Sequence, residues 1–251
     1  WVDWRLGADP QPLPIDAGWA APLAPGLGIA YLGGGTLSQR LDTGATVQLA
    51  KGVDSAAVSP NGRTVAFLRL GSSGWEIDAV DVELRAQSRI QSSNQTLTDL
   101  AWAPDGSAIS YLAVGGGRSE LHVRRLASPG GDSAVAAGAI PDAVWQDARH
   151  LIFPATVPGR AGPQTLIFKR AATDSAATAL DPAGGLPVGF GAPVKDPRGS
   201  PGGRQIAFLA DAGSGAQVWL MNADGTGLNQ LTRYDANDFP YSVSELAWTR
   251  G

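Results

Sequence analysis

Short apolar runs alternate with glycine- and proline-containing turns along most of the chain. The run TVAFL (64–68) places apolar residues on both faces of a strand, which predicts a strand buried on both sides. The run EIDAVDV (76–82) alternates more clearly between polar and apolar residues, which is typical of a strand with one buried face. Helical solenoids would need apolar stripes with a 3.6-residue period, and the chain has none. The pattern therefore predicts consecutive antiparallel strands.

One sequence pattern returns several times. SPNGRTVAFLR (59–69) has counterparts in APDGSAISYLA (103–113) and SPGGRQIAFLA (200–210). AVWQDARHLIF (143–153) and APLAPGLGIAYLG (21–33) are weaker copies. Proline presets the backbone of a turn in most copies, while Asn, Asp or Gly accepts the left-handed corner. Each repeat is therefore expected to contain a hairpin corner followed by a buried strand.

Four strands per repeat predict a β-propeller, because repeated four-stranded units of about 40–45 residues are typical of propeller blades. A single blade exposes two apolar faces, and stacking it between neighbours removes both from water. Each fully buried Phe, Leu or Val then stabilises the fold by about 1.5–3 kcal/mol. Four aromatic residues occupy equivalent positions and are expected to pack between blades: Phe67, Tyr111, Phe153 and Phe208.

The two ends of the chain are expected to share one blade. WVDWRLGADPQPLP (1–14) resembles the outer half of a blade, and SELAWTRG (244–251) resembles an inner strand. The prediction is one all-β domain: a six-bladed β-propeller of four-stranded antiparallel blades, closed by the N- and C-terminal segments. The approximate blades are 17–51, 52–94, 95–139, 140–183, 184–236, and 237–251 with 1–16.

Composition narrows the class of protein. Hydrophobic residues make up 43% of the 251 residues and charged residues 17%, which fits a globular chain. A net charge of −4 argues against binding to nucleic acid. The longest apolar runs are too short to span a bilayer, so we expect no membrane contact by this segment. Since Trp1 begins no recognisable signal peptide, the sequence is interpreted as a soluble portion of a longer precursor, and any membrane anchor would lie outside it.

Sequence motifs for catalysis are missing. The chain has no cysteine, no G-x-S-x-G elbow, no G-x-G-x-x-G and no P-loop lysine. His122 and His150 are its two histidines, so a three-histidine metal site is impossible, and we expect a structural or surface role for both. The sequence therefore predicts no catalytic residue, no metal site and no cofactor.

Aligning the repeats brings four acidic residues to one position, just before the inner strand of their blades: Asp54, Asp99, Asp142 and Glu245. Inner strands line the channel of a propeller, so these carboxylates are expected to surround one channel mouth. Such a ring would attract a cation, a basic side chain or an arginine-bearing loop of a partner. In the alternative interpretation, which stays open, each Asp caps the turn that enters its strand.

Two long loops are expected to project from the same face as these carboxylates. They are GGLPVGFGAPVKDPRG (184–199), interpreted as an insertion that forms a surface loop, and YDANDFPYSV (234–243). Aromatic side chains on loops held by a rigid scaffold often build recognition surfaces. The candidates are Phe190, Tyr234, Phe239 and Tyr241, and ordinary loop variation explains these residues equally well.

The repeats resemble the WD-like repeats of TolB-type propellers. The resemblance rests on SPNGRTVAFLR, APDGSAISYLA and SPGGRQIAFLADAGSGAQVWLMNADGTGLNQLT (200–232), and it is weaker at 20–50 and 140–180. The turn aspartate of that family is present as Asp105 and is replaced by Asn61 and Gly203. The resemblance implies a bacterial, extracytoplasmic protein that binds other proteins as a scaffold, or the amino-terminal gate of a prolyl-oligopeptidase-type peptidase.

We therefore expect a non-catalytic protein-binding or ligand-sensing scaffold, periplasmic or extracellular, that binds a protein or a small ligand through the loops and the channel mouth of one face. The alternatives are the propeller domain of an enzyme, either lyase-type or peptidase-gating, and a structural subunit of a surface complex. An attached catalytic domain or a clustered acid/base set in the channel mouth would favour the enzyme.

Overall fold

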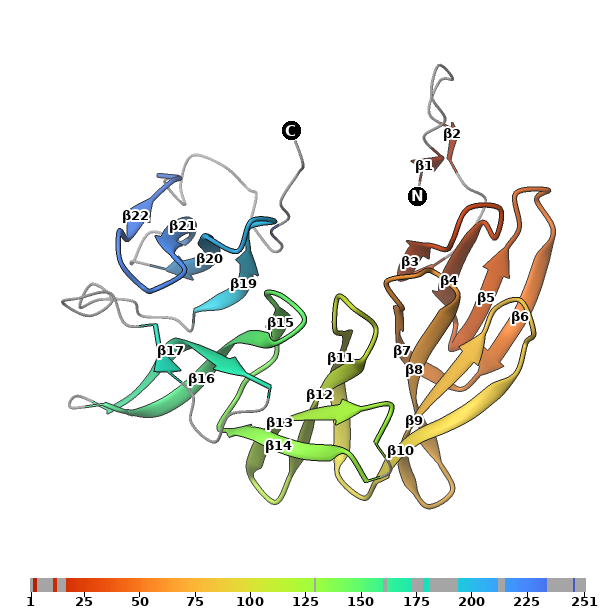
Figure 1. Cartoon of the computed structure of the whole chain (residues 1–251), viewed down its shortest axis with the longest axis horizontal. Helices are drawn as coiled ribbons and strands as arrows, with labels where there is room; N and C mark the ends of the chain where they lie inside the picture. The colour runs from red at the N-terminus through yellow and green to blue at the C-terminus, as the bar shows by residue number, and fades with distance from the viewer. Residues whose placement is uncertain are drawn as a thin grey trace. The chain divides into compact units, whose positions relative to one another are not determined.

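The structure is a computed structural model that describes residues 2–3, 11–12, 17–128, 130–159, 162–172, 178–180, 194–211, 215–233 and 246. The chain divides into two compact units, Trp1–Trp102 and Ala103–Gly251. In both units the regular elements of the described residues are β-strands (Figure 1). No helix in this part of the chain is long and apolar enough to cross a membrane.

The first unit contains a short hairpin and two four-stranded antiparallel sheets. The hairpin pairs β1 (Val2–Asp3) with β2 (Gln11–Pro12). One sheet has the order β3-β4-β5-β6: Trp19–Pro22, Ile29–Gly33, Thr36–Arg40 and Thr46–Lys51. The next has the order β10-β9-β8-β7, in which β7 is Val53–Val58, β8 is Thr64–Gly71, β9 is Gly74–Asp81 and β10 is Gln87–Ser93. The unit ends with β11 (Thr96–Trp102).

The second unit continues the same pattern. It begins with the adjacent strands β12 (Ala108–Gly115), β13 (Arg118–Arg125) and β14 (Asp132–Ala137). A four-stranded antiparallel sheet follows: β15 (Val144–Trp145), β16 (His150–Gly159), β17 (Gly162–Ala171) and β18 (Thr178–Ala179). The last sheet is β19 (Lys195–Gly199), β20 (Gln205–Asp211), β21 (Ala216–Asn222) and β22 (Asn229–Gln230). The fold is therefore all-β and built from four-stranded antiparallel sheets.

β19 corrects one prediction from the sequence. Residues 184–199 were expected to form a surface loop, but Lys195–Gly199 is a strand paired with β20, interrupted by a register shift between Lys195 and Arg198. Its sequence, KDPRG, contains a proline and a glycine, both of which are unfavourable inside strands. The irregular pairing accommodates them at the edge of the sheet. Residues 184–193 lie outside the described part of the chain.

The aromatic residue that four of the repeats share is buried in each of those four. Phe67 and Phe208 are 0% exposed, Phe153 is 1% exposed and Tyr111 is 2% exposed. Phe67, on β8, packs in one apolar cluster with Leu37 of the preceding sheet. The expected burial of the four residues is therefore confirmed, and the packing of Phe67 joins neighbouring sheets in the first unit.

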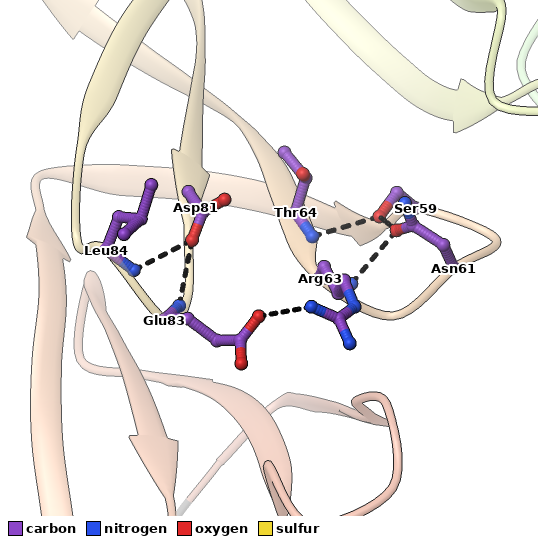
Figure 2. Close-up of polar contacts among 7 residues, drawn as sticks. All are labelled: Ser59, Asn61, Arg63, Thr64, Asp81, Glu83 and Leu84. Atoms are coloured by element: carbon purple, nitrogen blue, oxygen red, sulfur yellow. Dashed lines mark hydrogen bonds and ion pairs between the residues drawn. The ribbon is translucent and has the colours of Figure 1, made fainter.

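The repeated motif forms the corner between the first two strands of a sheet, as Figure 2 shows for the second sheet. Ser59 Oγ donates to Asn61 Oδ1 over 2.7 Å and accepts from the Thr64 N–H over 3.0 Å. Asn61 Oδ1 also accepts from the Arg63 N–H over 3.0 Å. In the next copy Asp105 takes the role of Asn61 and accepts from the Ser107 N–H over 3.0 Å. Side-chain oxygens of the motif thus accept hydrogen bonds from backbone N–H groups that have no backbone acceptor in a tight corner.

A second contact joins this corner to the turn between the third and fourth strands. The carbonyl of Arg63 accepts from the N–H of Val82 over 3.0 Å. On the surface, Arg63 Nη1 pairs with Glu83 Oε2 over 2.6 Å, and Asp81 Oδ1 accepts from the Glu83 N–H over 2.9 Å (Figure 2). The backbone bond recurs in three later repeats, from Leu126 to Ser107, from Ala172 to Arg149 and from Ala223 to Arg204.

The glycine of the motif contacts the preceding sheet. The Gly62 carbonyl accepts from the backbone N–H of Ala24 over 3.0 Å. In the second unit the Gly203 carbonyl accepts from Nε2 of Gln146 over 2.7 Å. The motif therefore supplies a corner within one sheet and a hydrogen bond to its neighbour.

Candidate functional site

Asp54 lies near the start of β7 in an irregular part of the strand. The pairing of β7 with β8 shifts register between Val53 and Ser55, so Asp54 is the extra residue of a bulge. The Asp54 side chain is exposed, and among the described residues it makes no hydrogen bond or ion pair. The backbone next to it is fixed, because the Val53 N–H donates to the Gly35 carbonyl over 3.0 Å.

A pocket of about 400 Å³ opens beside this carboxylate within the first unit. It lies between the first strands of the β3–β6 sheet and the start of β7. Its lining includes Trp19, Leu32, Gly35, Val53, Asp54 and Ser55. The volume is at the lower end of the range of about 300–1,000 Å³ found for small-ligand sites. The pocket therefore accommodates one large side chain or a ligand of similar size.

The other aligned aspartates have an unusual backbone. Asp99 and Asp142 adopt positive φ angles of 58° and 86°, and Asp196 adopts 47°. Aspartate tolerates this left-handed conformation better than most residues. Asp196 was missed in the sequence because its segment was interpreted as a loop. The signal that would have found it is its spacing, since Asp196 precedes Pro201 by five residues, as Asp99 precedes Pro104.

In the second unit, Asp142 and Asp196 each accept a hydrogen bond from a backbone N–H about 50 residues later in the chain. Asp142 Oδ2 accepts from the Asp196 N–H over 3.2 Å. Asp196 Oδ2 in turn accepts from the Leu246 N–H, and its Oδ1 lies 2.5 Å from Nη2 of Arg198. Arg198 Nε donates to the Leu246 carbonyl over 3.0 Å. Asp142 and Asp196 thus have structural contacts of the kind that the capping alternative expects, whereas Asp54 does not.

Several residues proposed from the sequence lie outside the described part of the chain: Phe190, Tyr234, Phe239, Tyr241 and Glu245. The ring of four carboxylates and the aromatic loop surface therefore remain predictions. Within the described ranges, no group of three or more His, Asp or Glu side chains is arranged to hold a metal ion.

A polar cluster that the sequence did not reveal lies on β12, β13 and β14. The Tyr111 hydroxyl donates to Asp132 Oδ1 over 2.7 Å, and His122 Nδ1 lies 3.0 Å from Asp132 Oδ2. The Tyr111 and His122 rings stack with their centroids 5.1 Å apart. The hydrogen bond to Asp132 raises the pKa of His122 above its usual value. Burial opposes the ionisation of Asp132, but hydrogen bonds from His122 and Tyr111 outweigh it and lower the pKa of this carboxyl.

These pKa shifts predict how stability depends on pH. A histidine whose pKa is raised in the folded state stabilises fully below its unfolded pKa, near 6.5, and loses that contribution as the pH rises through the folded value. The second unit is therefore expected to lose stability as the pH rises above about 6.5. Urea unfolding at a series of pH values should show this loss in the wild type and in His150→Gln, but not in His122→Gln. An unchanged pH profile in His122→Gln would contradict the assignment to His122.

Comparison with known proteins shows which proteins this chain and its fold resemble. No protein-family model matches the chain. The chain is 29% identical over 174 residues to the Tol-Pal system protein TolB of Anaeromyxobacter dehalogenans, a match that covers 69% of this chain and 28% of that protein. The crystal structure of TolB from Acinetobacter baumannii superposes with a TM-score of 0.57 at 18% identity, over 78% of this chain and 48% of that one. The chain is therefore similar to TolB in sequence and has the fold of TolB-like β-propellers.

This TolB-like propeller also has a relative among peptidases. A segment of 55 residues is 42% identical to the uncharacterized peptidase YuxL of Bacillus subtilis, covering 22% of this chain and 8% of that protein. The TolB-like propeller thus spans less than a third of the length of either curated relative.

Proposed function

We propose that this TolB-like propeller is a non-catalytic scaffold that binds a protein partner, or senses a ligand, through the end of the molecule where Asp54 lies. The observation that carries the proposal is the pocket beside Asp54. Two hydrogen-bonded sheets set its position, and no residue of the described part of the chain pairs with its acidic rim. Recognition residues on a rigid β scaffold keep their geometry without an ordering cost on binding.

We further propose that the propeller has six blades and acts outside the cytoplasm, in the periplasm or the extracellular space. Two contacts support a shared closing blade. The β1–β2 hairpin pairs Val2 with Pro12, as the outer strands of a blade would. Leu246 hydrogen-bonds to Asp196 and Arg198 next to β19, as the inner strand after the last described sheet would. The extracytoplasmic location rests on the similarity to TolB.

A site-specific cross-linking experiment tests the scaffold. A photo-reactive amino acid is introduced at Gly34, on the rim of the pocket, or at Leu84, an exposed residue in the turn after β9. Each variant is irradiated with an extract of the extracytoplasmic fraction, and the adducts are identified by mass spectrometry. We expect one dominant protein adduct at Gly34 that is absent at Leu84, since only the first probe faces the pocket. Equal labelling from both positions, or none from Gly34, would contradict the proposal.

The alternative is a propeller that gates a peptidase. The 42% identity to the YuxL peptidase over 55 residues favours it. The complete reading frame that contains this sequence separates the two functions, because a gating propeller requires a hydrolase domain on the same chain. A hydrolase domain there would replace the scaffold proposal, and its absence would remove the gating function.

A further inference from the structure

The pocket beside Asp54 combines an apolar wall with an acidic rim. Trp19 and Leu32 are cross-strand partners on β3 and β4, and both pack against the apolar cluster of the first unit while staying partly exposed. Val53 is 4% exposed and belongs to that cluster. Cross-strand pairs of this kind hold their side chains side by side. The wall is thus an extension of the core that remains accessible to a ligand.

No cationic side chain among the residues that the structure describes pairs with the negative charge of Asp54. The arginine on the neighbouring strand is Arg69, which pairs with Val53 across the sheet. Its guanidinium is already occupied, with Nε 3.0 Å from Glu76 Oε2 and Nη2 2.5 Å from Asp78 Oδ2. A carboxylate at the rim of a pocket with no cation nearby attracts a positively charged ligand group.

A second polar group in the pocket lacks a partner. Ser55 Oγ is inaccessible to solvent and makes no hydrogen bond, although most buried polar groups in folded proteins are hydrogen-bonded. The hydroxyl can both donate and accept. Because Ser55 Oγ is inaccessible to solvent, a ligand in the pocket would bring its N–H donors to the exposed Asp54 carboxylate and not to this hydroxyl.

We infer that this pocket binds an arginine side chain presented by a protein partner, an inference that rests on the scaffold function proposed above. The aliphatic stem of arginine would cover Leu32 and Val53, and the guanidinium would lie against the Trp19 ring with its N–H groups directed to Asp54. Guanidinium groups stack on aromatic rings and form several hydrogen bonds in one plane. A lysine has a more strongly hydrated ammonium without this planar fork, so the arrangement selects arginine over lysine.

The test is a titration of the chain with two blocked tripeptides, acetyl-Gly-Arg-Leu-amide and the same peptide with citrulline, the neutral isostere of arginine. Binding is followed through the indole N–H resonance of Trp19, which is assigned with Trp19→Phe. We expect saturable binding of the arginine peptide and about two- to fivefold weaker binding of the citrulline peptide. Asp54→Asn should weaken binding of the arginine peptide by a similar factor, whereas Asp42→Asn, the same change at an exposed turn, should not. A lysine peptide should bind more weakly than the arginine peptide.

The inference is overturned if both peptides bind equally, if Asp54→Asn binds like Asp42→Asn, or if the arginine peptide does not shift the Trp19 resonance. A failure of the arginine inference can be distinguished from a failure of the proposed scaffold function. If the Gly34 probe still captures one protein while the arginine peptide does not bind, then the scaffold function stands and the arginine preference is wrong. If the Gly34 probe captures nothing, the scaffold itself fails. Equal thermal unfolding midpoints of Asp54→Asn and Asp42→Asn verify that a loss of binding is not a loss of folding.

Discussion

Replacing Gly62 with alanine is expected to destabilise the first unit by about 3 kcal/mol or more. Gly62 has a φ of +69°, a conformation that costs a residue with a Cβ about 1–2 kcal/mol. A Cβ built on it would lie 2.3 Å from the backbone N of Ala24 and 2.8 Å from the backbone C of Leu23. Because these are backbone atoms of the preceding sheet, relief of the clash would also strain the hydrogen bond from Ala24 to the Gly62 carbonyl.

Gly26→Ala is the matched control for this substitution. Gly26 has a similar φ of +83°, but a Cβ there would meet no atom within 4 Å. Gly26→Ala should therefore lower the free energy of unfolding only by the cost of the left-handed backbone, about 1–2 kcal/mol. Hydrogen exchange followed by mass spectrometry can measure both losses within the first unit, through peptides from β4 and β8. Equal losses in the two variants would mean that the close approach to Ala24 contributes nothing.

Asp78→Ala is expected to lower the free energy of unfolding of the first unit by about 1.5–3 kcal/mol, because it removes a buried carboxylate that contacts both Arg69 and Arg89. Asp78 is 3% exposed and Glu76 is 8% exposed. Arg69 Nη2 lies 2.5 Å from Asp78 Oδ2, and Arg89 Nη2 lies 2.7 Å from Glu76 Oε2. Arg89 Nε also donates to Asp78, and this hydrogen bond raises the pKa of the guanidinium. The four side chains form one network, so the loss of Asp78 affects both arginines.

The control for Asp78→Ala is Glu83→Ala, which removes an exposed ion pair in the same sheet. Arg63 and Glu83 are 2.6 Å apart, but their side chains are 58% and 43% exposed. Surface ion pairs contribute about 0–1 kcal/mol. Glu83→Ala should therefore change the exchange rates of β8 and β9 little, and 0.5 M salt should not abolish the effect of Asp78→Ala, since a buried network is screened less. A loss in Asp78→Ala no larger than in Glu83→Ala would show that the network is energetically unimportant.

The repeat spacing was sufficient to predict most of the strands and their corners, but β19 was missed. It located the buried aromatic side chain in four copies because that position depends on the distance from the turn. The alternation in EIDAVDV, in contrast, was misleading, since every residue from Glu76 to Val80 is buried. Polar residues tolerate burial there because Arg69 and Arg89 reach them from the strands on either side. Such pairs depend on how strands align, which local sequence does not specify.

The cluster around His122 was missed for the same reason. β13 and β14 shift register between Leu121 and His122, and this bulge determines which residues of β14 lie near the histidine. Asp132 is ten residues from His122 and 21 from Tyr111, so no short motif connects them. Asp54 lies near the start of β7, but the pocket beside it depends on Trp19 and Leu32, whose pairing the repeat pattern did not give.

The contact of the motif glycine with the preceding sheet bears on how such a chain can evolve. The acceptor is the backbone carbonyl of the glycine at both Gly62 and Gly203. The donor is the backbone N–H of Ala24 in the first contact and the side-chain amide of Gln146 in the second. A duplicated sheet that retains the glycine corner can therefore stack on a neighbour with a different sequence. Successive copies are free to diverge at the positions that face a partner, and a repeat protein can in this way acquire one specialised pocket without losing its regular stacking.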